Sequence, residues 1–161
     1  MKKLFLTLGF LGMIHFGFAQ EITLEKIYSG YYRGKNIAGI ASLKNGENYA
    51  VIERGGIAKY SYKTTEKVGN IVDGSFESYI FSDDESKILL QKESEPIYRH
   101  SFLGKFDVKD LTSGKIISLN NGNFVQEPKF SPNGKLVAFI SANNLFYQDL
   151  ESGKITQITN D

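Results

Sequence analysis

Residues 98–102, with the sequence YRHSF, bring together the side chains best suited to binding or to chemistry. Arg99 offers a planar set of N–H donors that fits a carbonyl or carboxylate group. His100 and Ser101 have the types of a base and a nucleophile, but adjacent residues of a strand point to opposite faces. Residue types alone leave two interpretations of Arg99 open: a group that binds a carbonyl or carboxylate of a ligand, or an anchor that holds its own loop by binding backbone oxygens.

Other catalytic chemistry is not visible in the chain. A Ser-His-Asp triad needs an imidazole base, and His100 is the only histidine after the first 19 residues. No Gly-x-Ser-x-Gly elbow occurs. There is no cysteine and no carboxylate cluster with loop spacing, so we predict neither a metal site nor a cofactor. The acidic residues 83–85 fit a solvated turn, and Gly55-Gly56 lacks the Lys and Ser/Thr of a phosphate-binding loop.

The first 19 residues have the features of a signal peptide. Lys2 and Lys3 precede an apolar run over residues 4–18, and residues 17–19 form a small-x-small cleavage site. The run is short for a membrane span of about 20 residues. We therefore predict cleavage, export to the periplasm or the exterior of a bacterial cell, and no membrane contact afterwards. The chain has 19 basic and 18 acidic residues, without blocks of one sign, which argues against nucleic acid as a partner.

A strand–turn–strand pattern occurs three times, and each copy is followed by a second, related phrase. The copies are residues 43–51, 81–90 and 130–139, and the second phrases are residues 60–68, 106–116 and 146–155. A period of roughly 40–45 residues with four short strands per unit is typical of a β-propeller.

We therefore predict an all-β fold: a partial β-propeller of about three four-stranded antiparallel blades over residues 39–161, after a lead-in at residues 20–38. The predicted strands are residues 39–42, 49–53, 57–62, 67–72, 78–81, 87–92, 104–110, 115–118, 127–130, 135–141, 144–149 and 154–158.

Two segments interrupt this rhythm. Residues 22–27 are predicted as a short helix or an edge strand. Residues 93–103 are an insert between the second and third strands of the second blade, predicted to be an extended loop on a functional face. Since propellers typically have about four to eight blades, we expect the chain to be a fragment of a longer protein.

With the insert in view, the sequence resembles the N-terminal propeller of the dipeptidyl peptidase IV family of serine exopeptidases, in the prolyl oligopeptidase clan. The resemblance covers essentially all of residues 21–161. It is carried by residues 22–27, 81–85, 98–102, 106–111 and 128–138. Many bacterial propellers share the blade phrases, whereas an Arg-His-Ser insert before a strand that ends in Asp-Leu is more specific.

The resemblance implies a propeller that caps an α/β-hydrolase domain, with the active site between them. Arg99 would bind a backbone carbonyl of the peptide substrate, and Tyr98, His100 and Ser101 would support the loop. The family's paired glutamates and its nucleophile, acid and base are expected beyond Asp161. We therefore expect this chain to contain no catalytic residue and to be inactive alone.

The implied partners are a peptide that loses an N-terminal dipeptide, of Xaa-Pro type, the C-terminal hydrolase domain, and a second copy of the full-length enzyme in a homodimer. Two alternatives stay open. One is a non-catalytic periplasmic propeller that serves as a binding scaffold. The other is a different peptidase of the clan, similar to acylaminoacyl peptidase.

Overall fold

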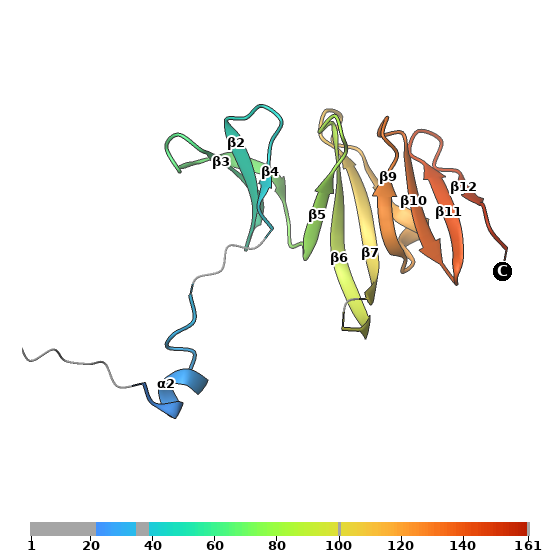
Figure 1. Cartoon of the computed structure of the whole chain (residues 1–161). Coiled ribbons are helices and arrows are strands. Elements are labelled where there is room, and N and C mark those ends of the chain that lie inside the picture. Colours follow the sequence, from blue (N-terminus) through green and yellow to red (C-terminus); the bar gives the residue numbers. More distant parts are fainter. Residues whose placement is uncertain (1–21, 35–38, 100, 161) are drawn as a thin grey trace, which may run out of the picture. The chain divides into compact units, whose positions relative to one another are not determined.

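The structure is a computed structural model that describes residues 22–34, 39–99 and 101–160 (Figure 1). The predicted signal peptide and His100 lie outside the described residues. The chain divides into two units, Met1–Asn36 and Ile37–Asp161.

The described part of the first unit contains one short helix, α2 (Leu24–Tyr28). Thr23 is its N-cap, and the Thr23 hydroxyl accepts a hydrogen bond from the Lys26 amide at 3.3 Å. The two alternatives predicted for residues 22–27 are thereby resolved in favour of the helix. None of its residues is buried.

The described part of the second unit consists of three four-stranded antiparallel sheets, each with its strands paired in chain order. This meander is the arrangement of a propeller blade, and the predicted all-β partial propeller is confirmed. The first sheet contains β1 (Ala41–Ser42), β2 (Asn48–Glu53), β3 (Gly56–Ser61) and β4 (Lys67–Asp73). The second contains β5 (Ser78–Phe81), β6 (Lys87–Tyr98), β7 (Ser101–Asp110) and β8 (Ile116–Ser118). The third contains β9 (Gln126–Phe130), β10 (Leu136–Ser141), β11 (Asn144–Asp149) and β12 (Ile155–Gln157), after a short 3₁₀ segment, η1 (Leu119–Gly122).

Most predicted strands agree with the observed ones to within one or two residues, but β6 and β7 are much longer than predicted. The insert is not an extended loop, because its two sides pair with each other as continuations of β6 and β7. The prediction was wrong here because the cross-strand partner, and not local sequence, decides whether a polar segment becomes a strand.

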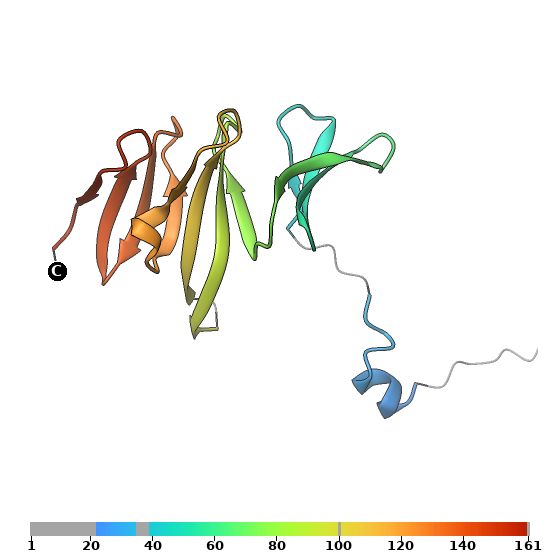
Figure 2. The same cartoon turned by 180° about the vertical axis from the view of Figure 1, so that it is seen from behind.

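Apolar side chains gather between neighbouring sheets in two clusters. One cluster joins the first and second sheets through the buried residues Ala50, Ile57, Val72, Ile88 and Leu90. The other joins the second and third sheets through Leu89, Phe106, Val108, Leu119, Val125, Val137, Phe139 and Leu150. Figures 1 and 2 show the second and third sheets beside each other from opposite sides.

Strand β6 shows most clearly why the sequence lacks a simple polar/apolar alternation. Its consecutive residues point to opposite faces of the sheet, and both faces are covered. Ile88 and Leu90 enter the first cluster, whereas Leu89 enters the second. A blade between two others is therefore apolar on both sides.

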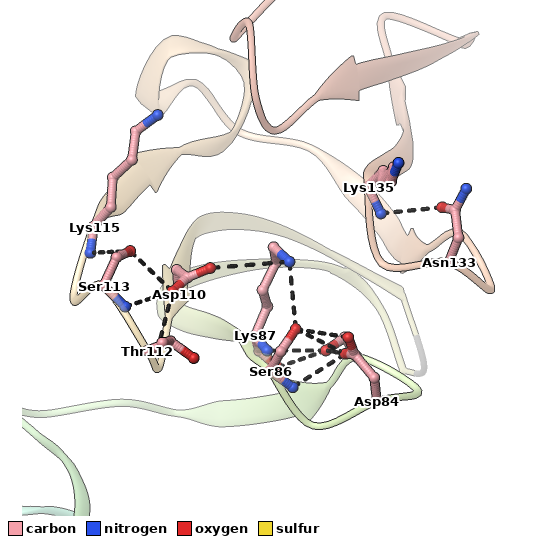
Figure 3. Close-up of polar contacts among 10 residues, drawn as sticks. Asp84, Ser86, Lys87, Asp110, Thr112, Ser113, Lys115, Asn133 and Lys135 are labelled. Carbon is pink, nitrogen blue, oxygen red and sulfur yellow. Dashed lines mark hydrogen bonds and ion pairs between the residues drawn. The ribbon is translucent and has the colours of Figure 1, made fainter.

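The turns at one end of the blades are held by side-chain hydrogen bonds (Figure 3). In the loop after β7, the Asp110 carboxylate accepts bonds from the Thr112 and Ser113 amides at 3.0 and 2.7 Å. After β11, Asp149 accepts bonds from the Glu151 and Ser152 amides at the same two distances. The repeated Asp-Leu-x-Ser-Gly-Lys phrase is thus a repeated turn structure.

Candidate functional site: the β6–β7 arm

The distinctive element of the second sheet is a two-stranded extension that we call the arm, residues 92–105. Strand β5 pairs with β6 only as far as Gln91, and β8 pairs with β7 only from Asp107 onward. Beyond these residues β6 and β7 continue to pair with each other without β5 or β8, and Figure 1 shows them projecting past the end of β5. Two register shifts, between Gln91 and Glu93 and between Pro96 and Tyr98, interrupt the pairing within the arm.

The tip of the arm carries an open hollow lined by aromatic, apolar and polar side chains. The hollow has a volume of about 530 Å³ and is lined by Ser94, Pro96, Tyr98, Arg99, Ser101 and Phe102. Tyr98 is 80% exposed and Phe102 is 38% exposed. Exposed aromatic side chains beside a cation are suited to contact with an extended peptide.

Arg99 lies in the turn at the tip and is exposed. Within residues 22–34, 39–99 and 101–160, the structure contains no hydrogen bond or ion pair to its guanidinium group. The alternative role that residue types left open, an anchor for its own loop, therefore receives no support from the described contacts. An unpaired guanidinium is available to a carbonyl or carboxylate of a ligand.

The other residues that the resemblance placed in this loop lie close to Arg99 along the chain. Tyr98 ends β6, Ser101 begins β7, and the two are cross-strand partners. Both are exposed, so they frame the turn without burying Arg99. His100 lies outside the described residues.

The base of the arm is attached to the chain segment that leads into the third sheet, an attachment that we did not predict. Gly104 and Val125 form an isolated antiparallel bridge: the Gly104 amide donates to the Val125 carbonyl at 2.8 Å, and the Val125 amide donates back at 2.9 Å. The Lys105 ammonium group lies 2.8 Å from a Glu93 carboxylate oxygen and 4.5 Å from the centre of the Phe124 ring. No signal in the sequence marks this contact, because Lys105 belongs to β7 and Phe124 to the segment between η1 and β9.

Two other kinds of feature are absent from the described part of the chain. No group of three or more His, Cys, Asp or Glu residues there could hold a metal ion. No helix among the described residues is long and apolar enough to cross a membrane. Every buried polar side-chain atom of these residues has a hydrogen-bond partner. The arm therefore remains the candidate site.

Comparison with known proteins identifies the family that this chain resembles. Residues 82–161 match the profile of the dipeptidyl peptidase IV (DPP IV) N-terminal region. Probable dipeptidyl-aminopeptidase B of Phaeosphaeria nodorum is 30% identical over 90% of this chain and 19% of its own length. The corresponding protein of one Aspergillus niger strain is also 30% identical, over 88% of this chain and 19% of its own length.

A solved structure gives the same result at the level of the fold. The crystal structure of Porphyromonas gingivalis dipeptidyl peptidase 4 superposes with a TM-score of 0.77 and 27% identity, over 88% of this chain and 22% of that chain. The three sheets are thus a partial propeller of the kind found in that enzyme. Residues 82–161 carry the N-terminal region of the dipeptidyl peptidase IV family, as the resemblance implied, and the similarity to the relative and to the solved structure covers about nine-tenths of the chain. It spans about a fifth of the length of the curated relatives that it matches.

Proposed function

We propose that this chain is the N-terminal propeller part of an exported serine dipeptidyl peptidase, in which the arm presents Arg99 to the backbone of a peptide substrate. In this proposal the propeller positions the peptide, and an α/β-hydrolase domain removes an N-terminal dipeptide, of Xaa-Pro type. The chain itself contributes binding and orientation rather than a nucleophile. A homodimer of the full-length enzyme belongs to the same proposal.

The observation that carries the proposal is the exposed position of Arg99 and the lack of a described partner for its side chain. Arg99 stands at the tip of a projecting hairpin, beside exposed Tyr98 and Phe102, with no described partner for its guanidinium group. A structural arginine would normally bind backbone or carboxylate oxygens, because an idle guanidinium contributes nothing to folding. The dipeptidyl peptidases among the relatives supply the substrate class.

The test is to replace Arg99 in the longest natural protein that contains this sequence and to measure release of a dipeptide from an Xaa-Pro anilide. A charge-assisted hydrogen bond contributes about 1.5–3 kcal/mol. Arg99→Ala should therefore lower kcat/KM by roughly ten- to a hundredfold. The melting temperature should stay the same, because the side chain stabilises nothing in the described structure.

Arg54→Ala is the matched control, since Arg54 is an exposed arginine in the β2–β3 turn, outside the arm. It should leave kcat/KM unchanged. If Arg99→Ala lowers the melting temperature but keeps full activity per folded molecule, Arg99 is a loop anchor. If the natural protein releases no dipeptide and contains only further blades, the scaffold alternative is correct.

A further inference from the structure

The arm projects beyond β5 and β8, the strands that flank β6 and β7 in the rest of the sheet, so its position needs a separate explanation. An isolated two-stranded hairpin is marginally stable in water. The arm also contains Pro96, which cannot donate a backbone hydrogen bond. Something outside the hairpin must therefore fix the direction in which its tip points.

The backbone bridge between Gly104 and Val125 supplies one fixed point. Val125 is fully buried in the cluster between the second and third sheets, so it is a rigid partner. Position 104 cannot carry a larger residue without a shift, because a Cβ atom there would lie 2.5 Å from the ring of Phe106, itself 4% exposed. A bridge at a single residue pair nevertheless leaves the hairpin free to rotate about that pair.

Lys105, the residue that follows Gly104, supplies a second point of attachment for the arm. Its ammonium group contacts Glu93 on the opposite strand at 2.8 Å and the face of Phe124 at 4.5 Å. The side chain thus ties both strands of the arm to the segment that precedes β9. The contacts also fall beside the register shift between Gln91 and Glu93, where the hairpin is most easily bent.

We propose that Lys105, Glu93 and Phe124 form a clamp that holds the tip of the arm, and with it Arg99, in the position needed to bind substrate. These are positioning residues, since none of them lines the hollow at the tip. The proposal rests on the substrate role proposed for Arg99, but the clamp can be tested without activity.

The direct test measures the position of the arm. The native chain has no cysteine, so spin labels can be attached at Tyr98→Cys on the tip and Glu151→Cys on the third blade, and the distance between them measured by pulsed electron paramagnetic resonance. We expect a single narrow distance distribution. Lys105→Ala and Phe124→Leu should broaden it, Phe124→Leu because leucine keeps most of the volume but lacks the aromatic face. Lys105→Arg should keep it narrow, since a guanidinium group both pairs with a carboxylate and stacks on a ring.

Lys92→Ala is the control at the base of the same arm. Lys92 pairs with Asp107 at 3.0 Å and is not part of the clamp, so its removal should leave the distribution narrow. An unchanged distribution in both Lys105→Ala and Phe124→Leu would overturn the proposal, as would equal broadening in Lys92→Ala.

The kinetic test links the clamp to Arg99 in the full-length enzyme. A cation–π contact at an exposed site implies a loss of about two- to fivefold in kcat/KM for Lys105→Ala, restored by Lys105→Arg. In the Arg99→Ala variant, Lys105→Ala should not lower kcat/KM further, because the clamp affects binding only through the position of Arg99. An equal loss in both backgrounds would contradict the clamp. If Arg99→Ala alone leaves kcat/KM unchanged, the proposed function fails and the distance measurement alone decides on the clamp.

Discussion

The turns of the blades and the tip of the arm both carry charged and hydroxyl side chains, but they differ in how many hydrogen bonds those side chains make within the protein. In the turns, the carboxylates of Asp84 and Asp110 (Figure 3) each accept several hydrogen bonds from neighbouring serines and amides, and so does that of Asp149. At the tip, Arg99 has no described partner and Tyr98 is largely exposed. A polar side chain whose bonding capacity is filled within the protein stabilises the fold. One whose capacity is unfilled at a projecting position is available to a ligand.

The electrostatics of the turns support this distinction. A hydrogen bond from Ser82, followed by bonds from the Ser86 amide and hydroxyl, lowers the pKa of Asp84 to about 2. The Ser113 amide and hydroxyl lower the pKa of Asp110, and Ser152 does the same for Asp149. Each shift comes mainly from hydrogen bonds to the ionised carboxylate. In these turns a lowered pKa therefore marks a structural carboxylate, not a catalytic one.

The largest difference between the blades and the arm should appear when an aromatic ring is removed from each. Phe139 is 1% exposed and stacks on Phe146 with ring centres 5.7 Å apart. Phe139→Ala should lower the free energy of unfolding by about 3–5 kcal/mol, because it removes a buried ring and leaves a cavity. Phe102→Ala, on the arm, should cost less than about 1 kcal/mol. Urea unfolding followed by circular dichroism measures both, and losses of similar size would show that the arm is part of the cooperative core.

A smaller difference is expected for two serines. The Ser82 hydroxyl is buried; it donates to Asp84 at 2.7 Å and accepts from the Lys87 amide at 2.9 Å. Ser82→Ala leaves that amide without its side-chain acceptor and should cost about 1–3 kcal/mol. Ser101→Ala, at the exposed start of β7, should change stability by no more than about 0.5 kcal/mol. The same unfolding experiment applies, and a larger loss at Ser101 would assign the tip a structural role.

The blades could be predicted from the sequence because their information is local. Short β-branched and aromatic runs alternate with turn residues, and the Asp-Leu-x-Ser-Gly-Lys phrase specifies a turn by itself. The paired strands of the arm could not be predicted in this way. Glu93, Glu95 and Pro96 disfavour a strand locally, and Pro96 is tolerated because this hairpin has no further strand beside it. The clamp between Lys105 and Phe124 depends on how two blades pack, which no spacing in a single sequence encodes.

The smallest expected effect is a change in how the melting temperature depends on pH in acid. The pKa of Asp84 is lower in the folded protein, about 2, than the ordinary value of 3.8. Its ionised form therefore stabilises the fold above about pH 4, and that contribution is lost as the pH falls through about 2. Asp84→Asn should thus lower the melting temperature slightly at pH 6 and reduce the further decrease between pH 4 and pH 2. Part of the decrease in melting temperature should remain in Asp84→Asn, because the pKa values of Asp110 and Asp149 are lowered too.

Glu95→Gln is the matched change on the arm, where the Glu95 carboxylate has no hydrogen bond or ion pair among the described residues. It should leave the melting curve the same at every pH. Differential scanning calorimetry of the three proteins between pH 2 and pH 7 provides the comparison. If Asp84→Asn and Glu95→Gln respond alike to acid, the turn carboxylate is no more structural than the exposed one. The proposed difference between the hydrogen-bonded carboxylates of the turns and the side chains of the arm would then be wrong for stability in acid.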